Sequence, residues 1–176
     1  ALLRDGRIDA AASLLETPPT RNIALLSDFY AIDEIVVFKR RDSPLRYVKW
    51  DHLIGLRVAT TAGDSLDWEL DEFLSTHSRL HKVTDLKTVF RVVRYGRADV
   101  GVHRYYSVLL GLGGSDHGAD LVMLHNHVTI ALLHMGFART SPCAALVDDF
   151  NAALRQMRRN GSISRFVQEE MEILRR

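Results

Sequence analysis

The chain has 176 residues, of which 47% are hydrophobic and 26% are charged, and its formal net charge is +1. These values are typical of a globular protein with one good core or two small ones. No basic run is interleaved with aromatic residues, so nucleic acid is disfavoured as a partner. The longest largely apolar run, 128–133, has the length of a strand and falls far short of the roughly 20 residues that span a bilayer.

The first quarter of the chain predicts short strands separated by turns. Pro18 and Pro19 argue against both a helix and a central strand around them. The chain starts at Ala1 within an apparent helix that has no N-cap, so we expect an upstream signal peptide, a further part of the fold, or both. In chain order we expect the end of a helix (1–5), a small strand (8–12), a proline turn (13–21), a second turn (27–30), a β-branched strand (35–39) and a polar crossing segment (40–48).

The middle of the chain alternates strands with helices. Leu66, Leu70, Phe73 and Leu74 recur at helical spacing. After a helical turn at 51–54, we expect strands at 56–61, 79–83 and 98–103. Each strand is followed by a helix, at 66–76, 84–95 and 105–112 respectively. This alternation predicts an α/β fold with parallel sheets covered by helices, and such sheets bind ligands at the carboxyl ends of their strands.

The last third predicts strands followed by helices. Ser141 and Pro142 are a typical helix start, and Asn160-Gly161 a typical stop. We expect a glycine-rich loop at 113–118, strands at 121–124 and 128–133, and amphipathic helices at 141–159 and 165–174.

One local pattern occurs twice. Gly6-Arg7-Ile8-Asp9 and Gly96-Arg97-Ala98-Asp99 share the order glycine, arginine, apolar residue and aspartate. Each copy is predicted to lie between a helix end and a strand. Two copies in so short a chain indicate two similar α/β lobes.

Six motifs follow one another along the chain: Gly6–Ala10 with Thr17-Pro18 and Arg21, Leu26–Tyr30, Asp51–Val58, Thr61–Ser65, Gly96–Asp99, and Phe150–Leu154 with Asn160-Gly161. In this order they resemble the family-3 extracytoplasmic solute-binding proteins of bacterial amino-acid ABC transporters. The resemblance covers nearly the whole chain, although the family's first strand–helix–strand would precede Ala1.

The resemblance implies an α/β, two-lobed periplasmic-binding-protein type II-like fold with an incomplete first lobe. Lobe one would comprise 1–40 and 138–176, lobe two 41–137, and the crossing strands would lie near 35–39 and 128–133. It also implies a periplasmic or extracytoplasmic protein that binds a small carboxylate-bearing solute between its lobes, for ABC-type uptake or sensing, with a permease as partner.

Two alternatives stay open. The chain could be an accessory or regulatory domain of a larger cell-envelope enzyme, such as a lytic transglycosylase, or of a sensor kinase. It could also be a degenerate fragment that binds nothing.

Arg21 is the first candidate ligand residue. The matching arginine of the family holds the ligand's carboxylate, and a guanidinium offers a fork of donors suited to that group. The alternative is a solvated loop arginine. Glu16 and Thr17 lie beside it, and Glu16 either meets a ligand amine or pairs with Arg21.

Thr61, Asp64 and Ser65 lie between a predicted strand and a predicted helix. Free amides at a helix N-terminus attract anions, so these residues are candidate ligand contacts. Capping of the helix by Asp64 or Ser65 explains the same pattern, and the two roles are compatible.

Arg104 departs from the family pattern. It occupies the position where family members commonly carry the aspartate that binds the ligand's α-ammonium, and an arginine there would repel a cation and attract an anion. If both Arg21 and Arg104 contact the ligand, a dicarboxylate or other anion is favoured. Otherwise the ligand is an amino acid and Glu16 or Asp64 has taken over its amine. A separate alternative is that Arg104 points to solvent at the start of the helix. His103 flanks Arg104.

No motif indicates catalysis or a cofactor. The chain lacks a nucleophile–base pattern and a phosphate-binding glycine loop, so we expect a non-enzymatic protein without a cofactor. His125, His127 and His134 have no neighbouring carboxylate or cysteine, which disfavours a metal site. Cys143 is the single cysteine, so an intrachain disulfide is excluded.

Overall fold

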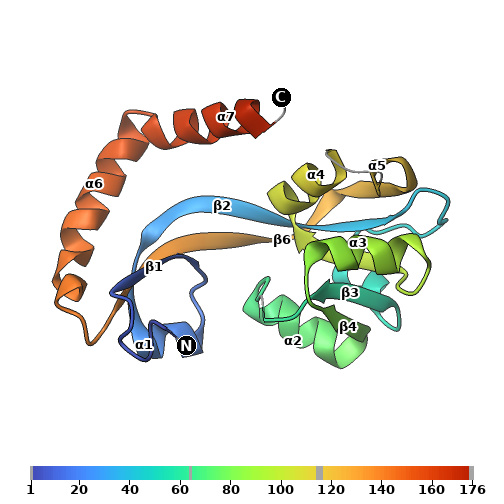
Figure 1. The fold of residues 1–176 in the computed structure, drawn as a ribbon, viewed down its shortest axis with the longest axis horizontal. Helices are drawn as coiled ribbons and strands as arrows, with labels where there is room; N and C mark the ends of the chain where they lie inside the picture. The colour runs from blue at the N-terminus through green and yellow to red at the C-terminus, as the bar shows by residue number, and fades with distance from the viewer. Residues whose placement is uncertain (1, 64, 114–116, 175–176) are drawn as a thin grey trace. The chain divides into compact units, whose positions relative to one another are not determined.

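The computed structural model describes residues 2–63, 65–113 and 117–174 (Figure 1). It divides into two compact units: unit 1 is Ala1–Ile32 with Leu132–Arg176, and unit 2 is Asp33–Ala131. Two long strands, β2 (Ala24–Arg40) and β6 (Leu121–Ala138), have residues in both units.

Unit 2 is built on β2, β5 (Val100–Arg104), β3 (Arg57–Thr61) and β4 (Arg79–Val83), which are neighbours in that order. Strand β3 pairs parallel with both β4 and β5, as the alternation of strands and helices predicts. Strand β5 pairs antiparallel with β2, so the unit's sheet is mixed.

Helices cover this sheet and supply its core (Figure 1). Helix α3 contacts β3, β4 and β5. Its apolar face enters one buried cluster with residues of β2, β3 and β4, in which Phe38 and Phe90 make an edge contact with ring centroids 5.1 Å apart. The helical elements of unit 2 are η1 (Trp50–Leu53), α2 (Trp68–His77), α3 (Leu86–Arg94), α4 (Tyr105–Gly113) and α5 (His117–Asp120).

Unit 1 pairs the short strand β1 (Ala10–Leu14) antiparallel with β6. A small buried cluster of Leu3, Ala24 and Ala138 lies beneath this pair. The helical elements are α1 (Pro18–Ile23), η2 (Pro142–Leu146), α6 (Val147–Arg159) and α7 (Ser162–Leu174). Two of the sequence motifs meet here, because the Asn151 side chain accepts a hydrogen bond from the Asp28 backbone at 2.7 Å.

Three local predictions were wrong. The proline turn at 13–21 gives way to helix α1 from Pro18, since prolines at the first two helical positions leave no backbone hydrogen bond unmade. The second turn, 27–30, lies inside strand β2. The strands expected at 121–124 and 128–133 are one continuous strand, β6, because pairing with neighbours holds the polar residues between them extended.

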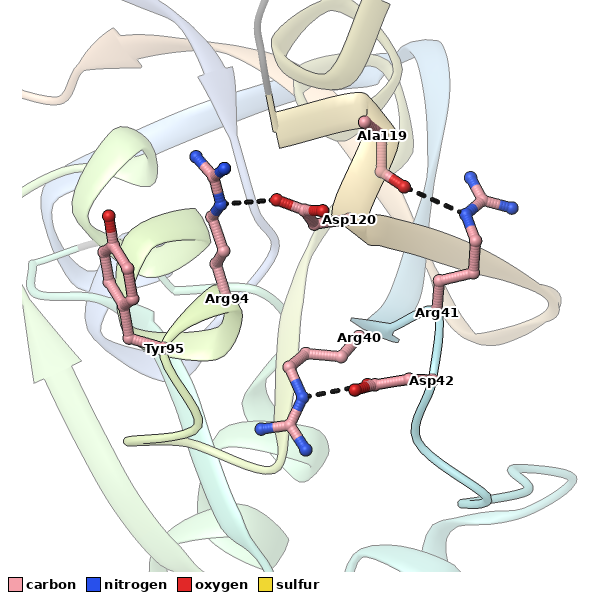
Figure 2. Close-up of a pocket in the computed structure, with 7 residues that line it drawn as sticks. All are labelled: Arg40, Arg41, Asp42, Arg94, Tyr95, Ala119 and Asp120. Carbon is pink, nitrogen blue, oxygen red and sulfur yellow. Dashed lines mark hydrogen bonds and ion pairs between the residues drawn. The ribbon is translucent and has the colours of Figure 1, made fainter.

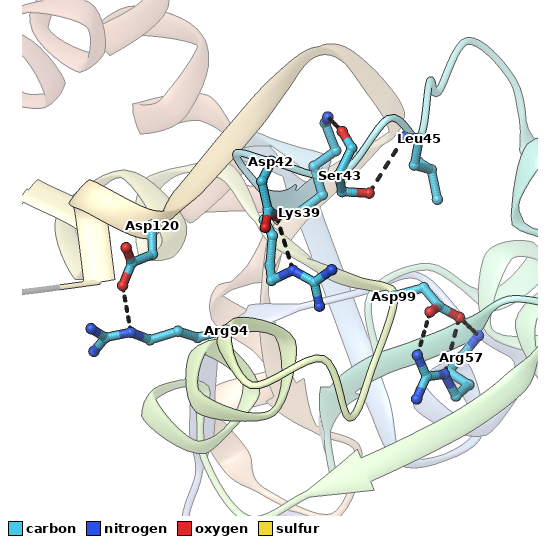
Figure 3. Close-up of polar contacts among 9 residues, drawn as sticks. Lys39, Asp42, Ser43, Leu45, Arg57, Arg94, Asp99 and Asp120 are labelled. Atoms are coloured by element: carbon cyan, nitrogen blue, oxygen red, sulfur yellow. Dashed lines mark hydrogen bonds and ion pairs between the residues drawn. The ribbon is translucent and has the colours of Figure 1, made fainter.

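The repeated motif is a repeated structure. Gly6 and Gly96 both have left-handed backbone conformations, with φ of +66° and +69°. The aspartate three residues later then fastens a neighbouring segment in each unit: Asp9 accepts from Ser141 Oγ at 2.6 Å, and Asp99 accepts from the Arg57 backbone at 2.8 Å and from its guanidinium (Figure 3).

Candidate functional site

One edge of the unit 2 sheet gathers polar side chains. Strands β3 and β5 are parallel and end at this edge with Thr61 and Arg104. Strand β2 runs in the opposite direction, and its Ile35 lies opposite Arg104. Asp33, the first β2 residue that belongs to unit 2, therefore lies at the same edge. This is the carboxyl edge of the parallel strands, where α/β sheets commonly bind ligands.

Arg104 is the central cation of this edge. Its side chain is 20% exposed, and Nη2 donates to the backbone carbonyl of Ser65 at 3.0 Å. Its Nη1 is buried and lies 4.0 Å from Asp33 Oδ2, which is too long for a hydrogen bond. Among the residues that the structure describes, none accepts a hydrogen bond from Nη1.

Asp33 is the matching anion, with a side chain only 11% exposed. Burial raises its pKa above the ordinary value of 3.8, and Arg104 and the backbone N–H of Tyr106 oppose that rise without cancelling it. Its Oδ1 is buried, and no described donor hydrogen-bonds to it. The site therefore holds two opposite charges that are close together but imperfectly paired.

Thr61 and His103 lie side by side at the ends of the two parallel strands. Thr61 Oγ1 and His103 Nε2 are 3.3 Å apart, and both residues are buried. Thr61 and His103 therefore place two buried polar side chains at this edge of the sheet.

Ser65, in the segment between β3 and α2, does not cap helix α2, although the sequence pattern allowed that role. Helix α2 starts at Trp68, and Asp67 is its N-cap, accepting from the Leu70 backbone at 3.0 Å. Ser65 Oγ donates to Asp71 at 2.6 Å, and its carbonyl is the group that binds Arg104. Asp64 lies outside the described residues.

The other candidates lie in unit 1. Arg21 is paired with Glu16 at 3.0 Å, and its side chain is 65% exposed. Thr17 is buried and caps α1 by accepting from the Thr20 backbone at 3.2 Å. A cavity of about 320 Å³ in unit 1 is lined by these charges, by Arg139 and by Asp148.

A larger cavity, of about 490 Å³, lies at the opposite edge of unit 2 (Figure 2). Three arginines line it, but Arg40 pairs with Asp42 at 3.0 Å and Arg94 with Asp120 at 2.6 Å. Arg41 donates to the backbone carbonyl of Ala119 at 3.1 Å. Arg41 therefore ties the end of β2 to the segment before β6, and Arg94 ties α3 to α5, so we regard the cluster as structural.

Neither a metal site nor a membrane span emerges from the described part of the chain. There, no group of three or more His, Cys, Asp or Glu side chains is placed to hold a metal ion. No helix in the described ranges is both long and apolar enough to cross a bilayer.

Solved structures with a similar fold include the amino acid ABC transporter substrate-binding protein AbpA from Streptococcus pneumoniae, bound to L-arginine. Its TM-score is 0.80 at 12% identity, over 99% of this chain and 73% of that one. A mutant of ArgBP from T. maritima gives 0.77 at 20% identity, over 96% and 71%. The GluR0 ligand-binding core from Nostoc punctiforme, in complex with (L)-glutamate, gives 0.73 at 18% identity, over 96% and 75%.

The chain has the type II periplasmic-binding-protein fold. The fold expected from the sequence motifs is thereby confirmed. No protein-family model and no curated protein sequence matches the chain.

Within this type II fold, sequence reasoning missed Asp33. Its position carried a weak signal, because Asp33 and Glu34 directly precede the fully apolar run Ile35–Phe38. A carboxylate that directly precedes a buried stretch of strand is a candidate site residue. Its relevance depends on lying beside Arg104, and that proximity comes from strand pairing.

Proposed function

We propose that the protein binds a small carboxylate-bearing solute, an amino acid or a related organic acid, at the carboxyl edge of β3 and β5 in unit 2. The observation that carries this proposal is the partly buried Arg104 guanidinium, whose Nη1 finds no acceptor among the described residues. A buried donor left unpaired costs about 1–3 kcal/mol, and a ligand carboxylate that pairs with it recovers that free energy.

The arrangement around Arg104 suits this role. The Ser65 carbonyl holds one arm of the guanidinium, which leaves the other arm oriented before the ligand arrives. Preorganised donors lose less entropy on binding than free side chains do. Thr61 and His103 add a hydroxyl and an imidazole at the same edge.

Proteins that share the fold support the ligand class. AbpA is described as bound to L-arginine and the GluR0 core as in complex with (L)-glutamate. From these we propose an amino acid or a close relative as ligand, and a role in ABC-type uptake or in sensing outside the cytoplasm. A transporter permease is the proposed partner for uptake.

Calorimetry with a panel of amino acids, monocarboxylates and dicarboxylates tests the site. We expect one class of acid to bind, and Arg104→Ala to weaken that binding by about 2 kcal/mol, roughly 30-fold, because a charge-assisted pair is lost. Arg79→Ala is the matched control, since Arg79 is exposed at the start of β4, and it should leave binding unchanged. Micromolar binding of ordinary neutral or basic amino acids that Arg104→Ala does not affect contradicts the proposal.

The proposed binding involves no chemical change in the solute. One protein of similar fold is described as an ancestral amino acid-binding protein and a precursor of cyclohexadienyl dehydratase, so this point needs its own experiment. After prolonged incubation with stoichiometric protein, the bound acid should be recovered unchanged by NMR. A new product that appears with the wild type and not with Arg104→Ala would identify an enzyme instead.

A further inference from the structure

We propose that one end of unit 2 is a docking surface for the anionic headgroups of a phospholipid bilayer. This end lies where β3, β4 and β5 begin, opposite to the edge proposed to bind a solute. A bilayer is a different kind of partner from the solute, and binding of one does not require the other.

The sheet topology gathers arginines at this end. Parallel strands begin at the same edge, so Arg57 and Arg79 lie opposite each other at the starts of β3 and β4. Strand β2 runs antiparallel to β5 and finishes here, because its Lys39 lies opposite Val100. Together with the last turn of α3 and the turn that enters β5, these segments form what we call the basic end. Its arginines, among the described residues, are Arg40, Arg41, Arg57, Arg79, Arg91, Arg94 and Arg97.

Aspartates neutralise the basic end only in part. The aspartates described there each form an ion pair with one arginine, and Figure 3 shows the three pairs in one view: Asp42, Asp99 and Asp120. Arg79, Arg91 and Arg97 are exposed, and none of them forms an ion pair with a described side chain. Arginines therefore exceed aspartates by four at the described basic end, whereas the net charge of the whole chain is +1.

Helix stabilisation explains only some of these arginines. Arg91 and Arg94 lie in the last turn of α3, where cations interact favourably with the helix dipole. Arg57, Arg79 and Arg97 lie at or just before the starts of strands, and a sheet has only a small net dipole. The positive charge at the strand starts therefore needs another explanation.

Acidic side chains gather at the other edge of unit 2. Helices α2 and α3 begin there, after β3 and β4, and Asp67 and Asp85 are their N-caps. Glu69 and Asp71 add two carboxylates to the first turn of α2. An anionic surface therefore attracts the basic end and repels the acidic edge, which orients unit 2 as it approaches.

The side chains of the basic end suit a lipid interface. A guanidinium offers paired donors that match a phosphate group. Two large side chains beside the arginines are exposed to solvent, Tyr95 at 66% and Ile54 at 53%. Tyrosine is enriched at membrane–water interfaces, and apolar side chains enter the region between headgroups and acyl chains. Cations with an exposed aromatic ring and an exposed aliphatic side chain fit phospholipids better than a wholly polar partner.

Co-sedimentation of the wild type with lipid vesicles tests the proposal without any variant. We compare phosphatidylcholine vesicles with vesicles that also contain about 30% phosphatidylglycerol, at about 0.1 M salt. Partitioning onto the anionic vesicles should be at least about tenfold stronger. Raising the salt to about 0.5 M shortens the Debye length to about 4 Å and should remove most of the difference.

Two double variants locate the binding surface. Arg79→Gln/Arg97→Gln removes two exposed charges from the basic end, and Lys82→Gln/Lys87→Gln removes the same charge from exposed positions near the acidic edge. A cation beside an anionic bilayer strengthens partitioning by a factor of about five, so the first variant should weaken it by about 25-fold. The lysine variant should weaken it by less than about threefold, because those charges face away from the bilayer.

The outcomes separate a bilayer from a second copy of the chain, whose acidic edge is the other candidate partner for the basic end. Equal partitioning onto both kinds of vesicle, or equal losses in the two double variants, overturns the proposal. Salt-sensitive self-association in sedimentation velocity that Arg79→Gln/Arg97→Gln abolishes, without vesicle binding, assigns the basic end to a protein contact and also overturns it. Solute binding measured by calorimetry should be the same in both double variants and the wild type.

Discussion

Asp33 and Asp99 are both carboxylates of unit 2 with an arginine beside them, yet their pKa values move in opposite directions. The Arg57 guanidinium hydrogen-bonds Asp99 directly, at 2.5 and 3.2 Å, and lowers its pKa (Figure 3). Arg104 stays 4.0 Å from Asp33, so burial prevails and the pKa of Asp33 rises. Direct hydrogen bonds to the charged form, rather than the mere presence of a cation, therefore decide which of the two is a structural pair.

These shifts predict opposite effects of pH on stability. A raised pKa means that ionisation of Asp33 disfavours the folded state, so its contribution is most favourable below 3.8 and declines as pH rises through its higher folded pKa. In urea unfolding from pH 3.5 to 7, Asp33→Asn should gain stability relative to the wild type as pH increases.

Asp99→Asn supplies the matched contrast. The lowered pKa of Asp99 gives a contribution that is present above 3.8 and disappears as pH falls through its folded pKa. This variant should therefore lose stability relative to the wild type as pH rises, by about 1–2 kcal/mol at pH 7. Parallel pH profiles for the two variants would contradict the assignment of causes.

At the scale of elements, the pairing of β2 with β5 brings the site together. The register sets Ile35 against Arg104 and Phe38 against Gly101, so that Asp33 extends past the pair toward the carboxyl edge. Phe38 is fully buried and covers Gly101, where a Cβ atom would meet the phenyl ring at 2.1 Å. A glycine in the strand is therefore required by the close approach of an aromatic ring.

Gly101→Ala should accordingly destabilise the protein. The added methyl displaces Phe38 from a filled core, which typically costs about 1–3 kcal/mol. Gly113→Ala is the control, because a Cβ there meets nothing within 4 Å, and its stability should lie within about 0.5 kcal/mol of the wild type. Thermal or urea unfolding measures both, and equal midpoints would show that the β2–β5 register is wrong.

At the scale of the whole molecule, the two units differ in what holds them together. Unit 2 has a large buried cluster that draws on β2, β3, α3 and α4. The buried cluster of Leu3, Ala24 and Ala138 in unit 1 is small, and the described side chains of α7 are half-buried or exposed. Apolar burial is the main source of stability, so we expect unit 2 to be the more stable part.

Native-state hydrogen exchange tests this difference. Backbone amides of β3 and β5 should exchange more slowly than those of β1 and α7, because fewer buried contacts must break to open the latter. Val93→Ala removes buried volume from the unit 2 cluster and should speed exchange in β3 and β5. Uniform protection across both units would contradict the expectation.

Features that depend only on residues close together in the chain could be predicted from the amino-acid sequence. The alternation of strands and helices, the cap at Ser141, and the repeated turns at Gly6 and Gly96 are all local, and the structure shows each of them. Such features follow from backbone conformation and short-range hydrogen bonds, which a stretch of a few residues specifies.

Only the tertiary structure decided how β2 and β6 extend and which charges meet. The turn expected at 27–30 became strand because β2 continues beside β6 in the sheet. Asp33 became a candidate residue because antiparallel pairing carries it to the end of β5. Local sequence does not specify the register between distant strands, and burial shifts a pKa only after packing removes water from a group. The approach of Asp33 to Arg104, at 4.0 Å, is therefore a property of the tertiary structure.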